Sequence, residues 1–204
     1  MKNGGYMKDA LVLFVITLIS GLLLGGAYQI TKDPIEKASL AANLAAYKTV
    51  FPEAADFQIP DGAEDAIESC NADLASGKFG NTGVEQVLEA VDEGGNVAGH
   101  VITSYSEDSY SGPIRLSVGI KADGSISGVE LLEISDTPGL GLKAAEPEFK
   151  NQYVGKNAES LTVVKSGNAG DAEINSISGA TITSSAVTNA VNAALYYVHN
   201  YINQ

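Results

Sequence analysis

Hydrophobic residues dominate the start of the chain. From Ala10 to Thr31 no residue is charged, and the centre reads LVLFVITLISGLLLGG. About 20 helical residues, each rising ~1.5 Å, cross the ~30 Å hydrocarbon core of a bilayer. A cleaved signal peptide is the alternative, but its apolar region is shorter, about 7–15 residues, and ends in a cleavage site. The pattern predicts an uncleaved transmembrane helix over residues 10–31, preceded by a tail of residues 1–9.

The charges beside this segment give little information on orientation. Lys2 and Lys8 precede it, and Lys32 and Lys37 follow it. Because the two sides carry equal numbers of basic residues, the positive-inside rule favours neither orientation. The rest of the chain is strongly acidic, which does not favour contact with the anionic cytoplasmic leaflet. We expect a single-pass protein of the cell (inner or cytoplasmic) membrane, with its soluble domain on the extracytoplasmic side.

Residues 32–82 read as a helical linker followed by an acidic surface region. Pro34 can start a new helix, and IEKASLAANLAAYKTVF has apolar residues at helical spacing until Pro52 ends the pattern. Residues 53–82 are acidic and rich in turn residues, with room for one short helix.

The remaining residues, 83–204, alternate between strand and turn patterns before a final helix. Apolar residues at helical spacing from Ser184 to Tyr201 predict a helix with one buried stripe. Two hairpin turns, EGGN and KADGS, each join a pair of strand-like segments. These predicted strands are residues 84–92, 97–106, 114–120 and 126–135. A short helix over 146–157 and a further strand over 161–166 follow. The fold class is therefore α+β, with an antiparallel sheet and flanking helices.

Composition excludes several classes of function. The net charge of −13 argues against nucleic-acid binding, which needs Lys and Arg. Cys70 is the one cysteine, so neither an intrachain disulfide nor a cysteine-built metal or iron–sulfur site can form. His100 and His199 are the two histidines, and we expect structural or solvent-facing roles for both. We expect no metal site, and any electron chemistry must come from an organic cofactor.

The segment INSISGATITSSAV surrounds one Gly-Ala step with hydroxyl side chains, just before the final helix. Ser184 or Ser185 as a helix N-cap is the plain interpretation. A phosphate site is the alternative, because a helix N-terminus offers free amides and small residues allow close approach. Its candidate residues are Ser178, Gly179, Ala180, Thr181, Thr183 and Ser184.

A second segment, SDTPGLGLK, could form the other wall of such a site. Pro138 fixes one φ angle, while Gly139 and Gly141 allow close approach to a flat ring. Leu140 could cover the ring, Thr137 could bond its polar edge, and Lys143 could supply a positive charge. A plain surface turn is the alternative. Tyr110, in YSGP, is a weaker candidate from a third segment.

These motifs carry a family resemblance. SGATITS resembles the signature of covalent FMN-binding domains, and together with MKDALVLFVITLISGLLLG, YSGPIRLSVGI and DTPGLG it resembles the G subunit of the Rnf complex, an ion-pumping ferredoxin:NAD oxidoreductase. The C subunit of the sodium-pumping NADH:quinone reductase is a related family with longer insertions. An anchored domain that binds a phosphate ligand reversibly, without electron transfer, is the third hypothesis.

The resemblance implies FMN attached by a phosphoester to Thr181, with Ser178, Thr183 and Ser184 as hydroxyl partners. It also implies electron transfer between neighbouring flavin and iron–sulfur subunits, no independent substrate, no catalytic residue, and a separate Mg-dependent flavin transferase. Ile134, Asp136 and Asn175 depart from the residues usual in relatives, which show His, Glu and Asp at the corresponding places.

Overall fold

The computed structural model describes residues 4–165, 167 and 169–202, apart from the side chains of residues 4–7, 27 and 29–42. The first three residues of the predicted tail lie outside this part. The chain divides into two compact units, residues 1–43 and 44–204. Helix α1 (Gly4–Val50) begins in the first unit and ends in the second, and Pro34 does not interrupt it.

The first unit contains the apolar segment of α1. Residues Lys8–Gly26 have a mean hydropathy of 2.1, long and apolar enough to cross a membrane, and their side chains are exposed. Thr17 donates its hydroxyl proton to the Leu13 and Phe14 carbonyls, at 3.0 and 2.9 Å. The Thr17 hydroxyl is therefore satisfied within the helix, as a lipid environment requires.

The second unit is built on an antiparallel meander of five strands in the order β1-β2-β3-β4-β5. The strands are β1 (Asp56–Gln58), β2 (Thr82–Val91), β3 (Val97–Ser106), β4 (Ile114–Lys121) and β5 (Ile126–Ile134). Both predicted hairpins are present, and a carboxylate organises each turn. Asp92 accepts the amide protons of Gly94 and Asn96, and Asp123 accepts bonds from the Ser125 amide and hydroxyl.

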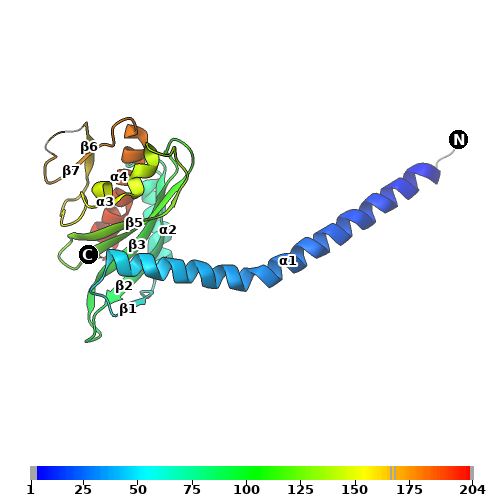
Figure 1. The fold of residues 1–204 in the computed structure, drawn as a ribbon. Coiled ribbons are helices and arrows are strands. Elements are labelled where there is room, and N and C mark those ends of the chain that lie inside the picture. Colours follow the sequence, from blue (N-terminus) through cyan, green and yellow to red (C-terminus); the bar gives the residue numbers. More distant parts are fainter. Residues whose placement is uncertain (1–3, 166, 168, 203–204) are drawn as a thin grey trace. The chain divides into compact units, whose positions relative to one another are not determined.

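Two helices cover one face of this sheet (Figure 1). Helix α2 (Ala63–Leu74) packs on β2, and helix α4 (Thr181–Tyr197) packs on β2, β3 and β4. A π-helical turn, Val198–Ile202, continues α4. Cys70 and Leu74 of α2 are fully buried with α4 and the sheet in one hydrophobic core. The acidic region after Pro52 thus contributes a core helix.

The end of α1 packs on the opposite face of the sheet. Tyr47, Val50 and Phe51 are buried there against Leu88 and Val101. Glycines on β3, β4 and β5 make room for them: a Cβ on Gly99 would overlap the Ile120 carbonyl and press on the Phe51 ring, and one on Gly119 or Gly128 would press on the Val50 backbone. Ser127 donates a hydrogen bond to the Val50 carbonyl at 2.6 Å.

Short elements complete the unit between β5 and α4. They are the 3₁₀ turn η1 (Gly141–Ala145), helix α3 (Pro147–Lys150), and the parallel pair β6 (Thr162–Val164) and β7 (Glu173–Asn175). Buried polar bonds fasten them to α4: Asn192 pairs with both backbone groups of Leu161, and Tyr153 bonds Thr188 at 2.8 Å. The α+β expectation is confirmed.

Candidate functional site

The segment SGAT forms a tight turn that leads into the core helix α4. The Ala180 amide donates to the Ile177 carbonyl at 2.9 Å, and Gly179 has φ +80°, which favours glycine. The first intrahelical bond of α4 runs from the Ser184 amide to the Ala180 carbonyl, at 3.0 Å. The amides of residues 181–183 precede that bond, so this end of the helix can donate to an anion.

The expectation that Ser184 or Ser185 caps the final helix is wrong. The helix begins at Thr181, and its N-cap, Ala180, makes no side-chain capping bond. Ser184, fully buried, donates its hydroxyl proton to the Ala180 carbonyl and accepts the Ile177 amide proton, both at 2.9 Å. Its side chain therefore fixes the turn before the helix from within the first helical turn.

The segment DTPGLG forms the facing wall. The Thr137 carbonyl accepts the amide protons of Leu140 and Leu142, at 3.1 and 3.3 Å, and Gly139 has φ +77°. The two walls meet where Leu140 approaches Gly179, because a Cβ on Gly179 would lie 3.1 Å from Leu140 Cδ2. The structure thus brings these two segments together at this contact.

Asp136 connects the two walls. Its Oδ2 accepts the hydroxyl protons of Thr183, at 2.5 Å, and Ser109, at 3.3 Å, and its Oδ1 accepts the Thr137 amide proton at 2.6 Å. Partial burial opposes ionisation, but the hydrogen bonds from Thr183, Thr137 and Ser109 outweigh it and hold the pKa of Asp136 below its ordinary value. The carboxylate is therefore charged at neutral pH.

A cavity of about 620 Å³ lies between the walls. This volume is within the range of small-molecule and cofactor sites. Three large side chains at the cavity are exposed, with Tyr110 at 71%, Ile182 at 55% and Leu140 at 42%. Thr181 is exposed, whereas Thr183 is only 1% exposed. The lining consists of Tyr110, Asp136, Thr137, Leu140, Gly141, Gly179, Ala180, Thr181, Ile182 and Thr183.

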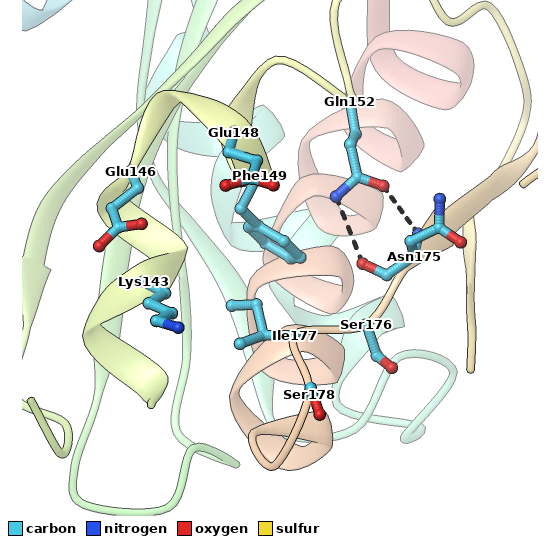
Figure 2. A pocket seen from close by; sticks show the side chains of 9 residues that line it. All are labelled: Lys143, Glu146, Glu148, Phe149, Gln152, Asn175, Ser176, Ile177 and Ser178. Carbon is cyan, nitrogen blue, oxygen red and sulfur yellow. Dashed lines mark hydrogen bonds between the residues drawn. The ribbon is translucent and has the colours of Figure 1, made fainter. Parts of the chain in front are cut away.

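A second cavity, of about 430 Å³, is lined by both polar and apolar side chains (Figure 2). It contains Lys143 and Ser178, and Phe149 and Ile177 contribute apolar surface. The Gln152 side-chain amide accepts the Asn175 amide proton at 2.8 Å and donates to the Asn175 carbonyl at 3.3 Å. The remaining lining residues are Glu146, Glu148 and Ser176.

The structure thus divides the predicted site residues into three groups. The larger cavity collects Thr181 and most of the others; Ser178 and Lys143 line the smaller one. Ser184, Pro138 and Gly139 line neither cavity. Sequence reasoning did not assign Asp136 or Ile182 to the site.

The departures from the usual residues of relatives have local structural roles. Asn175 Oδ1 accepts the Gly167 amide proton at 2.9 Å, and Ile134 packs against the main core.

Burial lowers the pKa of His100, with Glu89 opposing the shift. Among the described residues, no group of His, Cys, Asp or Glu could hold a metal ion.

Comparison with known proteins identifies the domain and the family. The FMN-binding domain family matches residues 109–196. The G subunit of the Na⁺-translocating ferredoxin:NAD⁺ oxidoreductase complex of Acetobacterium woodii is 32% identical over 197 residues, covering 95% of this chain and 91% of that protein. The chain belongs to the family of G subunits of ion-translocating oxidoreductase complexes. Another G subunit, from the proton-translocating complex of Clostridium ljungdahlii, is 27% identical over 201 residues, covering 95% of this chain and 96% of that protein.

Among solved structures, NqrC of Shewanella oneidensis is similar with 20% identity and a TM-score of 0.49, covering 76% of this chain and 72% of that chain. The family membership and the apolar segment of α1 indicate a membrane protein. The domain match supports FMN as its cofactor.

Proposed function

We propose that this chain is the component of an Rnf-type membrane complex that carries FMN and relays electrons during ion-coupled ferredoxin:NAD⁺ oxidoreduction. The proposal is supported by the domain match and by the names of the relatives from Acetobacterium woodii and Clostridium ljungdahlii. Bound FMN supplies electron transfer, while the protein binds and orients it. We propose no independent substrate and no catalytic residue for this protein.

We further propose that FMN is joined to Thr181 through a phosphoester. The observation that carries this step is the difference between the hydroxyls at the start of α4. Thr183 and Ser184 are buried and their protons are committed to Asp136 and Ala180, whereas Thr181 is exposed and lines the larger cavity. A phosphate on Thr181 would lie at the helix end whose amides are free to donate.

The cavity has the chemistry that FMN needs. The amides of residues 181–183 suit the phosphate, and the exposed side chains of Tyr110, Leu140 and Ile182 suit the faces of a flat aromatic ring. Ser178 and Lys143, in the neighbouring cavity, offer a hydroxyl and a positive charge beside the same turn. These residues would hold the cofactor and exclude water from one side of it.

A separate flavin transferase is part of this proposal. A threonine hydroxyl is a weak nucleophile without a base. Among the described residues that line the larger cavity none is a His or Lys, and the one carboxylate, Asp136, accepts hydrogen bonds from Thr183, Ser109 and Thr137 and has none to Thr181. In the transfer, Thr181 Oγ1 bonds to the FMN phosphorus of FAD, and the bond from that phosphorus to AMP breaks. AMP leaves with the electron pair, and the threonine proton is released.

The arrangement in the cell follows from the same reasoning. We propose residues 10–31 as the membrane span, after a tail of residues 1–9, and residues 83–204 as the FMN-binding domain, with residues 32–82 between them. The acidity of the chain supports an extracytoplasmic domain. Flavin- and iron–sulfur-carrying subunits would be the neighbours, as the resemblance to the Rnf complex implies.

The test is a mass measurement on full-length protein coexpressed with a flavin transferase. After denaturation, wild type should keep flavin fluorescence on a gel and gain the mass of FMN less water. Thr181→Ala should lose both signals, and Thr137→Ala, a threonine of the facing wall, should keep both. An unlabelled wild type would favour a reversible phosphate-binding domain. Copurification with quinone-reductase subunits instead of Rnf subunits would favour the role of the quinone-reductase C subunit.

A further inference from the structure

Asp136 is the one charged residue among the described residues that line the larger cavity. It lies at the junction of three segments: Ser109 follows β3, Thr137 is its neighbour in the facing wall, and Thr183 belongs to the first turn of α4. Gly141 packs directly on it, since a Cβ at this position would overlap the carboxyl group. The carboxylate is therefore held in a defined place beside Thr183, in the cavity that Thr181 also lines.

The hydrogen bonds of Asp136 determine which way the nearby protons point. An ionised carboxylate can only accept, so the hydroxyls of Thr183 and Ser109 must be the donors. The Thr183 oxygen then has lone pairs left but no proton to offer. The Thr137 amide is also committed to the carboxylate. Around Asp136 the cavity therefore offers acceptors and a negative charge.

The start of α4 contributes groups of the opposite character to the same cavity. The amides of residues 181–183 lie before the first intrahelical bond of α4 and can only donate. The positive end of the helix dipole adds to their attraction for an anion. A phosphate is stabilised by these amides and repelled by Asp136, so the cavity distinguishes the phosphate from the uncharged parts of a ligand.

We propose that Asp136 is a positioning residue that fixes the direction of the flavin and lowers its reduction potential. The amides of α4 would hold the phosphate, and Asp136 and the Thr183 oxygen would accept hydrogen bonds from donors of the flavin. The fixed negative charge of Asp136 in the same cavity would oppose the addition of electrons to the flavin. This inference rests on the proposed function, since it needs FMN in the cavity.

The experiment measures the midpoint potential of full-length, flavinylated protein by spectroelectrochemistry, with intact mass as a separate readout of attachment. Asp136→Asn removes the charge with little change in shape. Asp123→Asn is the matched control, because Asp123 also accepts a serine hydroxyl and a backbone amide. It lies beyond the other end of β5, a nine-residue strand, about 30 Å away at ~3.3 Å per residue.

Asp136→Asn should keep the FMN mass increase and raise the potential. A tenfold change in the relative affinity for the oxidised and reduced forms corresponds to about 30 mV for a two-electron couple, and we expect at least that shift. Asp136→Glu should retain the wild-type potential, and Asp123→Asn should not change it. A labelled Asp136→Asn protein with the potential of the Asp123→Asn control would overturn the proposal.

Two further measurements separate this inference from loss of folding and from the proposed function. Thr183→Val removes one hydrogen bond but keeps the charge, so the potential should stay or fall, and a rise would contradict the inference. An Asp136→Asn protein that unfolds at the control's temperature but carries no FMN would assign Asp136 to attachment, not orientation. Failure of the proposed function is distinct, because wild type itself would then lack FMN.

Discussion

The packing of the end of α1 on the sheet can be tested by adding a single methyl group. In Gly119→Ala, the new Cβ would overlap Ser127 Oγ and the Val50 carbonyl oxygen. Both are partners in the 2.6 Å hydrogen bond that fixes the end of α1. Since one neighbour is backbone, the methyl group cannot be accommodated by rotating a side chain.

The expected loss of stability follows from two contributions. Overpacking a well-filled site costs roughly 1–3 kcal/mol, and loss of the Ser127–Val50 hydrogen bond costs about 0.5–1.5 kcal/mol. We expect Gly119→Ala to lower the free energy of unfolding by about 2–4 kcal/mol. For a domain of this size each kcal/mol shifts the melting temperature by roughly 2–4 °C.

The assay is thermal unfolding of the full chain in detergent, followed by circular dichroism. Gly170→Ala is the matched control, because its Cβ would meet only the Glu173 carboxyl group at ordinary contact distances of 3.5 and 3.9 Å. Ser127→Ala should cost about 1 kcal/mol in wild type and much less in Gly119→Ala, because the hydrogen bond is already lost. A Gly119→Ala protein as stable as the control would refute this account of how the end of α1 packs on the sheet.

Two other predictions concern the thiol and the apolar helix. Burial, aided by Asp73, raises the pKa of Cys70 to about 12, so thiol reagents should label it only after denaturation. An exposed Asp123→Cys would then be the single reactive thiol, and an impermeant maleimide should label it in intact cells if the domain is extracytoplasmic; labelling only after lysis would reverse the orientation. Gly25 has open space around it; Gly25→Leu should reduce copurification with other subunits but leave FMN attachment unchanged, and lost attachment would contradict a packing role.

Much of the fold could be predicted because its signals are local. Asp92 and Asp123 begin turns in which Gly95 and Gly124 take positive φ, and alternating strands flank each turn. Such hairpins depend on neighbouring residues alone. The final helix was also predicted, but its first residue was not, since Ser184 acts from inside the first turn through a bond to Ala180.

Long-range packing explains what the sequence did not reveal. The acidic composition of residues 53–82 suggested a surface region, yet one stripe of α2 buries Cys70 and Leu74 in the core. Asp136 was noted only as a departure from its relatives. Its importance depends on Thr183, which is 47 residues away in the sequence, and on the space left by Gly141. Neither relation produces a periodic or motif-like pattern.

The position of Thr181 on the core helix has a consequence for motion. Its α4 neighbours Thr183 and Ser184 are buried, and α4 packs on three strands of the sheet. A prosthetic group on Thr181, as proposed above, would therefore be attached to the core of the domain. If such a group must travel between distant redox centres during turnover, the whole 44–204 unit would have to travel with it, because Thr181 is itself the first residue of the core helix.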